Sequence, residues 1–204
     1  MHEFDKTYWE RHWTPTAAAG PRSLPTNPYL PAETGHLPVG SALDAGCGTG
    51  TEALWLAGQG WQVTGADISG TALATATTRA AAAGLGDRIE WVETDLTRWE
   101  PDRTWNLVVT SYAHPDTGQL AFYRRIASWV APGGTLLIVG HLHGDEPHDH
   151  AHPDGATATP AGIAQLFRAP DWRVETCREN TRTVNMGDTA RQLRDVIVRA
   201  RRTP

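Results

Sequence analysis

Three glycines at alternate positions, with an acid on either side of them, are the residues of this sequence best suited to hold a ligand. Residues 43–50 read Leu-Asp-Ala-Gly-Cys-Gly-Thr-Gly, with the glycines at 46, 48 and 50. A strand that breaks into glycines before a helix lets a ligand lie against bare backbone, because no Cβ atoms block its approach. Asp67 ends a second strand-like run, where a carboxylate can accept hydrogen bonds from both hydroxyls of a ribose. The pair predicts a nucleoside-binding site.

The loop lacks the marks of two common nucleotide motifs. A Walker loop needs Gly-Lys-Ser/Thr, and the sequence contains no Gly-Lys pair. A dinucleotide fingerprint needs a glycine where Thr51 stands, which makes a nicotinamide oxidoreductase a distant alternative. Asp44 at the loop entrance would repel a pyrophosphate, but it suits a ligand with a cationic group such as a sulfonium or an ammonium.

These residues, together with two further motifs, resemble the class I S-adenosylmethionine-dependent methyltransferases. Thr94-Asp95-Leu96 and Ala131-Pro132-Gly133-Gly134 follow the loop and Asp67 in the order and at the intervals of that family, and the resemblance covers residues 35–145. It implies an α/β, Rossmann-like fold: a seven-stranded, mostly parallel sheet with one antiparallel strand and helices on both faces. It also implies S-adenosyl-L-methionine as cofactor, methyl transfer as reaction and S-adenosyl-L-homocysteine as product.

The resemblance assigns each motif a part of the cofactor. Asp44 and the glycine loop would line the methionine part, Asp67 would bind the ribose, and Asp95 would accept from the adenine amino group. Asp95 has an alternative interpretation as a turn residue or helix cap, and Cys47 is better read as a small packing residue than as a nucleophile. The predicted cofactor-binding residues of the core are Asp44, Gly46, Cys47, Gly48, Gly50, Asp67, Ile68, Asp95, Leu96 and Thr110.

The acceptor side is predicted from the ends of two later strands. Tyr112 and His114 follow the expected strand 105–110, and His141 ends the strand 135–140. Ligands of such sheets bind at the carboxyl ends of the strands, so these three are the candidate catalytic residues, as hydrogen-bonding groups or a general base. A single histidine in the position of His114 is more often a structural hydrogen-bonding residue than a base. Methyl transfer from a sulfonium needs no base unless the acceptor is protonated at neutral pH, and the sequence does not name the acceptor atom.

The aromatic segment 8–13 resembles the N-terminal segment of small methyltransferases of the tellurite-resistance and thiol-methylating type, where it folds over the cofactor as a lid. That resemblance implies that Arg11 meets the cofactor carboxylate and that Trp9 or Trp13 covers the sulfonium through a cation–π contact. It also brings a sulfur, selenium or tellurium acceptor into consideration beside oxygen and nitrogen. The alternative is an amphipathic helix that only docks on the core.

Five histidines fall between 141 and 152, namely His141, His143, His148, His150 and His152. They could ligate Zn²⁺, Ni²⁺ or Cu²⁺, but their spacing is not that of a closed structural site, and such tracts also occur as loops that bind metal adventitiously. We therefore predict no metal. A metal-handling protein and a non-catalytic cofactor-binding regulator remain the alternatives from other classes.

The alternation of elements predicts right-handed crossovers and a mostly parallel sheet. A helix is expected over the first 13 residues, and irregular chain over the proline-rich stretch 14–32. A closing antiparallel pair is expected at 172–176 and 194–198, with a polar loop at 178–189 between its strands. The remaining strands are expected at 41–46, 61–66, 88–93, 105–110 and 135–140, and the remaining helices at 51–59, 70–83 and 117–130.

Length and composition predict one methyltransferase domain over residues 1–204. Its parts would be a lid segment (1–34), a cofactor-binding core (35–145) and an acceptor-side segment with the last strands (146–204). The net charge of −5 argues against nucleic acid as a partner. With no apolar leader and no run of 18 apolar residues, we expect a cytoplasmic monomer or homodimer without a membrane partner that acts on a small-molecule acceptor.

Overall fold

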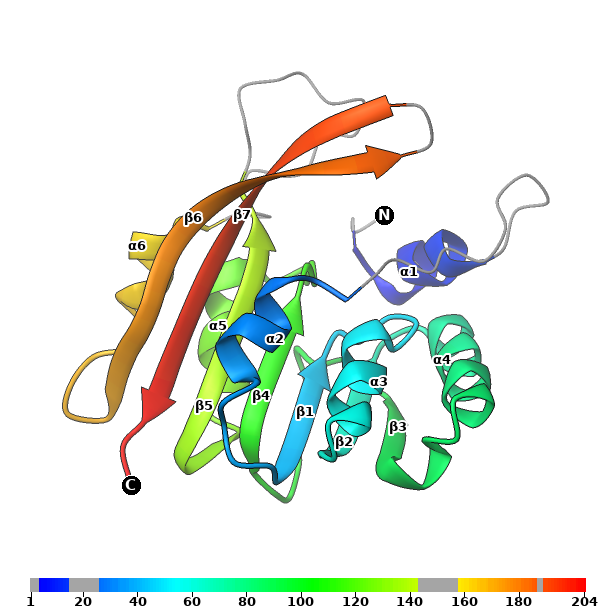
Figure 1. Cartoon of the computed structure of the whole chain (residues 1–204), viewed down its shortest axis with the longest axis horizontal. Helices are drawn as coiled ribbons and strands as arrows, with labels where there is room; N and C mark the ends of the chain where they lie inside the picture. Colours follow the sequence, from blue (N-terminus) through cyan, green and yellow to red (C-terminus); the bar gives the residue numbers. More distant parts are fainter. Residues whose placement is uncertain (1–3, 15–25, 143–157, 187–188) are drawn as a thin grey trace.

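The computed structural model describes residues 4–14, 26–142, 158–186 and 189–204. These residues form a seven-stranded sheet with helices packed on it (Figure 1). The strands lie in the order β3-β2-β1-β4-β5-β7-β6. Only β7 runs antiparallel to its neighbours β5 and β6, and the other pairs are parallel. The predicted sheet is therefore confirmed. The strands are β1 (Ser41–Ala45), β2 (Gln62–Asp67), β3 (Ile89–Glu93), β4 (Trp105–Ser111), β5 (Val130–His141), β6 (Trp172–Met186) and β7 (Thr189–Arg202).

Helices cover both faces of the sheet, because the side chains of each central strand alternate between two apolar layers. In β4, Leu107 and Val109 share an apolar cluster with residues of α2 and α3, whereas Val108 shares the other cluster with residues of α5 and α6. None of the described helices is long and apolar enough to cross a membrane. The helices are α1 (Lys6–Trp13), α2 (Tyr29–Thr34), α3 (Thr51–Gly58), α4 (Gly70–Ala82), the 3₁₀ turn η1 (Gly86–Arg88), α5 (Gln119–Ala127) and α6 (Pro160–Ala164).

The predicted polar loop at 178–189 is wrong. Strand β6 continues to Met186 and β7 begins at Thr189, so that the two form a long hairpin that extends beyond the rest of the sheet (Figure 1). The closing pair is antiparallel as predicted, but residues 172–176 pair with 199–202 rather than with 194–198, and Asn180 faces Asp195. The sequence of residues 178–186 is mostly polar. Ladder hydrogen bonds define the hairpin there, and the hydrophobic pattern used to find strands gives no signal.

Two further boundaries differ from expectation. Helix α2 begins at Tyr29, inside the stretch predicted to be irregular, while residues 15–25 lie outside the described part. Pro31 falls in its first turn, where a missing amide hydrogen leaves no bond unmade, and Asn27 Oδ1 accepts from the amides of Tyr29 and Leu30. Strand β5 begins at Val130 rather than 135, and a register shift against β4 accommodates its Pro-Gly-Gly segment.

Candidate active site

The glycine loop joins the carboxyl end of β1 to α3 and is held against the end of β2. The amides of Gly46 and Cys47 donate to the Ala66 carbonyl at 2.8 and 3.1 Å. The amide of Gly48 donates to Asp67 Oδ2 at 2.8 Å. All three glycines of the loop have φ between 51° and 79°, the left-handed region that other residues adopt at a cost. The loop therefore owes its path to the glycines.

Two indoles lie against this loop. A Cβ placed on Gly50 would lie 2.6 Å from Cη2 of Trp91, and one placed on Gly48 would lie 2.9 Å from Cζ2 of Trp13. Trp13 belongs to α1 and is among the predicted cofactor residues, whereas Trp91, in β3, is not. Trp91 is not predictable from the sequence as a neighbour of the loop, because an apolar residue in a strand indicates core packing and nothing more.

Asp44 is a buried acid with an unsatisfied oxygen. It is 1% exposed, and its Oδ2 has no hydrogen-bond partner among the described residues. Burial, followed by the nearby carboxylate of Glu52, raises the pKa of Asp44 well above its usual value. An unpaired carboxylate in this setting is costly, and a cationic group such as the ammonium of a bound amino acid would offset that cost.

Asp67 lies beside the loop at the end of β2. Its two carboxylate oxygens accept from the amides of Gly48 and Ser69 at 2.8 and 2.9 Å. Burial raises the pKa of Asp67, and these amide bonds oppose the rise. Each carboxylate oxygen can accept more than one hydrogen bond, so Asp67 keeps the capacity to accept from ribose hydroxyls.

The predicted adenine-side residues follow β2 and β3. Asp95 forms the turn that is its alternative interpretation, because Oδ1 accepts from the amide and hydroxyl of Thr97 at 2.9 and 2.6 Å. Ile68 is half-buried and Leu96 lies in the core. The contact of these residues with adenine stays a prediction.

Two other predicted cofactor residues have packing roles in the structure. Thr110 is buried and donates its hydroxyl to the Ala45 carbonyl at 2.8 Å, which fixes the end of β1. Cys47 is buried, and burial, followed by Asp44 and Asp67, raises the pKa of its thiol well above the usual value. A thiol that stays protonated is a poor nucleophile.

Helix α1 lies over the glycine loop and is attached to α4. Glu10 accepts from the Gly70 amide at 2.8 Å, the Ser69 hydroxyl at 3.2 Å and the Thr71 amide at 3.3 Å, at the start of α4. The sequence does not predict this attachment, since a glutamate in an exposed helix carries no distinguishing signal. Of the other predicted lid residues, Trp9 stacks on Phe4 with ring centroids 6.0 Å apart, and Arg11 is exposed.

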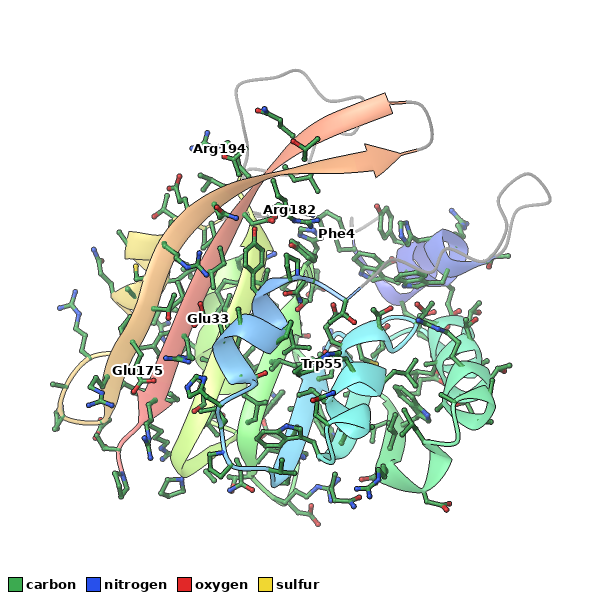
Figure 2. All side chains as sticks on the ribbon, viewed as in Figure 1. Phe4, Glu33, Trp55, Glu175, Arg182 and Arg194 are labelled. Atoms are coloured by element: carbon green, nitrogen blue, oxygen red, sulfur yellow. The ribbon has the colours of Figure 1, made fainter. Side chains whose placement is uncertain are left out.

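The three predicted catalytic residues lie together at the carboxyl ends of β4 and β5. The rings of Tyr112 and His141 stack at 4.2 Å, and the ring of His114 lies 6.4 Å from that of His141. Phe4 stacks on His114 at 5.6 Å, so the chain just before α1 reaches this group. Figure 2 shows Phe4 and Arg182 at this edge of the sheet.

A buried carboxylate that the sequence does not reveal lies beside this group. Asp195 in β7 is fully buried, and its Oδ2 accepts from Arg182 Nε at 2.6 Å and from the Tyr29 hydroxyl at 2.9 Å. Arg182 also donates to the Tyr112 hydroxyl at 3.1 Å. Both charged residues come from the hairpin, and Arg182 lies within the segment wrongly predicted as a loop.

The histidine-rich tract cannot be compared with its prediction, because His143, His148, His150 and His152 lie outside the described residues. Within the described part of the chain, no three metal-ligating side chains cluster. The absence of a metal stays a prediction.

Comparison with known proteins agrees with this geometry. A family model described as a methyltransferase domain matches residues 42–134, the segment from β1 to the Pro-Gly-Gly turn. A probable thiol methyltransferase 2 of Arabidopsis thaliana is 30% identical over 144 residues, 68% of this chain and 63% of that protein. The chain therefore carries a methyltransferase domain over residues 42–134. It spans less than two thirds of the length of that relative.

Solved structures of other proteins share the fold. A structure described by the conversion of a disulfide bond into a thioacetal group during echinomycin biosynthesis is 29% identical, with a TM-score of 0.64 over 86% of this chain and 81% of that one. TehB from Haemophilus influenzae has a TM-score of 0.71 over 98% of this chain and 67% of its own, at 17% identity. The second likeness concerns the fold alone. The predictions of fold class and family are confirmed.

Proposed function

We propose that this protein transfers a methyl group from S-adenosyl-L-methionine to a small-molecule acceptor. The observation that carries the proposal is the unsatisfied oxygen of Asp44, 1% exposed, beside a loop whose glycines leave its backbone bare. The donor carries an ammonium and a sulfonium, and a buried carboxylate with spare capacity suits a ligand of that charge. The residues present therefore fit the cofactor.

Asp44 and the glycine loop would hold the methionine part of the cofactor, and Asp67 the ribose. When bound, the cofactor supplies a methyl group that its positive charge already activates. The chain then has three tasks, which are to align the acceptor with that methyl group, to exclude water and to remove a proton where the acceptor has one. We assign alignment to Tyr112, His114 and His141, and exclusion of water to α1, whose Trp13 lies on Gly48.

A soft acceptor atom is the finer part of the proposal. The name of the Arabidopsis relative refers to a thiol, and the echinomycin structure concerns a disulfide and a thioacetal. The rings of Phe4, Tyr112, His114 and His141 form an aromatic cluster at the ends of β4 and β5, and aromatic rings make favourable contacts with a polarisable sulfur atom. The net charge of −5 does not favour a nucleic-acid acceptor.

The test is transfer of an isotopically labelled methyl group from S-adenosylmethionine to a panel of small thiols, phenols and amines. We expect labelled product from the wild type with at least one thiol, and strongly reduced product from Asp67→Ala. Tight binding of S-adenosylhomocysteine without transfer to any acceptor would contradict the proposal and favour a non-catalytic cofactor-binding role.

A further inference from the structure

The two carboxylate oxygens of Asp195 differ in their neighbours. Oδ2 is occupied by Arg182 and Tyr29, whereas Oδ1 accepts no hydrogen bond from the described residues and lies 3.5 Å from Nδ1 of His141. The sheet fixes this pair, because His141 and Asp195 face each other in the β5–β7 register. Contacts in catalytic sites are often long without substrate and tighten when it binds.

The histidine is held from its other sides as well. Its ring stacks on Tyr112 at 4.2 Å, and the Tyr112 hydroxyl is bound by Arg182. Tyr112 has a φ of 56°, which is a strained conformation for a residue with a side chain. Residues in such conformations are found preferentially at functional sites. The His141 side chain is 34% exposed, in contrast to the fully buried Asp195. His141 is thus positioned by buried groups and open to a ligand.

We propose that His141, oriented by Asp195, is the general base of the methyl transfer, and that the acceptor is therefore a neutral thiol which carries its proton at neutral pH. This inference rests on the proposed function. A carboxylate on Nδ1 selects the tautomer in which Nε2 is the free acceptor. Such a base has no use for an acceptor that is already an anion, whereas a thiol with an ordinary pKa of about 8.5 is mostly protonated at pH 7.

The transfer conserves atoms, electrons and charge. The acceptor sulfur forms a bond to the methyl carbon while the bond from that carbon to the sulfonium sulfur breaks. The electron pair of the broken bond stays on the cofactor sulfur. The thiol proton moves to Nε2 of His141 and leaves to solvent after product release. Asp195 stabilises the cationic imidazole in the interval, and Arg182 and the Tyr29 hydroxyl keep Asp195 ionised. Among the described residues, Asp195 from β7 and Tyr112 and His114 from the chain at the end of β4 contact His141. Arg182 from β6 and Tyr29 from α2 are bound to Asp195.

The first readout needs no turnover. In ¹⁵N NMR spectra of the full-length protein above pH 8, we expect His141 in the tautomer with the proton on Nδ1, and a shift toward the Nε2-protonated form in Asp195→Ala. His141 protonated on Nε2 in the wild type would overturn the proposal. Since Asp195→Ala leaves Arg182 without its buried partner, this variant can fail to fold, and His141→Gln then carries the test.

The second readout compares two sulfur acceptors. With 2-mercaptoethanol at pH 7, we expect His141→Gln to lower kcat/KM about 10²-fold, and the deficit to shrink as the pH rises through the pKa of the thiol. With thiocyanate, an anion without a proton, we expect no more than a twofold change. His36→Gln, which alters an exposed histidine after α2, is the matched control and should behave as wild type. Equal losses for both acceptors, or transfer to thiocyanate and to no thiol, would overturn the inference while the proposed function stands.

Discussion

The two halves of the proposed site, one for the cofactor and one for the acceptor, differ in how the sequence builds them. The cofactor half consists of the glycine loop and Asp67, which are joined by local hydrogen bonds at the ends of two adjacent strands. In the acceptor half, Asp195 binds Tyr29 across 166 positions of sequence, and Arg182 binds Tyr112 across 70. The first half is a motif, and the second exists only once the sheet has formed. Substitutions should therefore separate cofactor binding from acceptor chemistry.

The largest effect is expected at Gly50. Gly50→Ala combines a φ of 78° with a Cβ 2.6 Å from the Trp91 ring, and we expect a loss of about 2 to 5 kcal/mol in the free energy of unfolding together with loss of cofactor binding. Gly84→Ala is the matched control, because Gly84 has a φ of 68° and a Cβ placed on it would meet nothing within 4 Å. It should cost about 1 to 2 kcal/mol. Urea denaturation measures both, and equal losses would show that the loop is not closely packed.

The next effect concerns the unpaired acid of the cofactor half. Asp44→Asn should stabilise the ligand-free protein at pH 7 by about 1 to 3 kcal/mol and weaken binding of S-adenosylhomocysteine at least tenfold. Because the folded-state pKa of Asp44 is raised, the folded protein binds more protons than the unfolded chain, and stability falls as the pH rises above the ordinary carboxyl value.

The stability of Asp44→Asn should therefore decline less steeply with rising pH than that of the wild type. The free energies of unfolding of the two proteins should converge below pH 3.8, the ordinary pKa of an aspartate. Denaturation series across pH measure this difference. A variant less stable than the wild type at pH 7 would mean that Asp44 already has a partner in the ligand-free protein.

The smallest effect is expected at the attachment of α1. Glu10→Gln removes a negative charge from the start of α4, an interaction of about 0.3 to 1 kcal/mol, and should lower the hydrogen-exchange protection of α1 amides. Bonds from Thr71, Gly70 and Ser69 lower the pKa of Glu10 against the effect of burial. The attachment is therefore present above the ordinary carboxyl pKa and is lost as the pH falls through the lowered value. Glu93→Gln, which breaks the exposed pair with Lys6, is the control and should leave α1 protection nearly unchanged.

The same contrast explains what the sequence could predict. The glycine loop, Asp67 and the alternating strands are predictable because each is a contiguous pattern with a local physical cause. Tyr112, His114 and His141 are predictable because they follow the strands whose ends form the ligand edge. Asp195 and Arg182 are not, since residues 178–186 show no strand-like alternation of apolar residues. Only the β5–β7 register brings Asp195 to His141. Glu10 and Trp91 carry no signal beyond those of a surface acid and a core aromatic residue.

The central claim is that the cofactor half binds its ligand independently of the acceptor half. The most direct test is calorimetric titration of S-adenosylhomocysteine into the wild type, Asp67→Ala and His141→Gln. We expect micromolar binding to the wild type, about −7 to −9 kcal/mol, the same affinity for His141→Gln, and at least tenfold weaker binding to Asp67→Ala. Equal affinity of Asp67→Ala and the wild type, or a comparable loss in His141→Gln, would contradict the account.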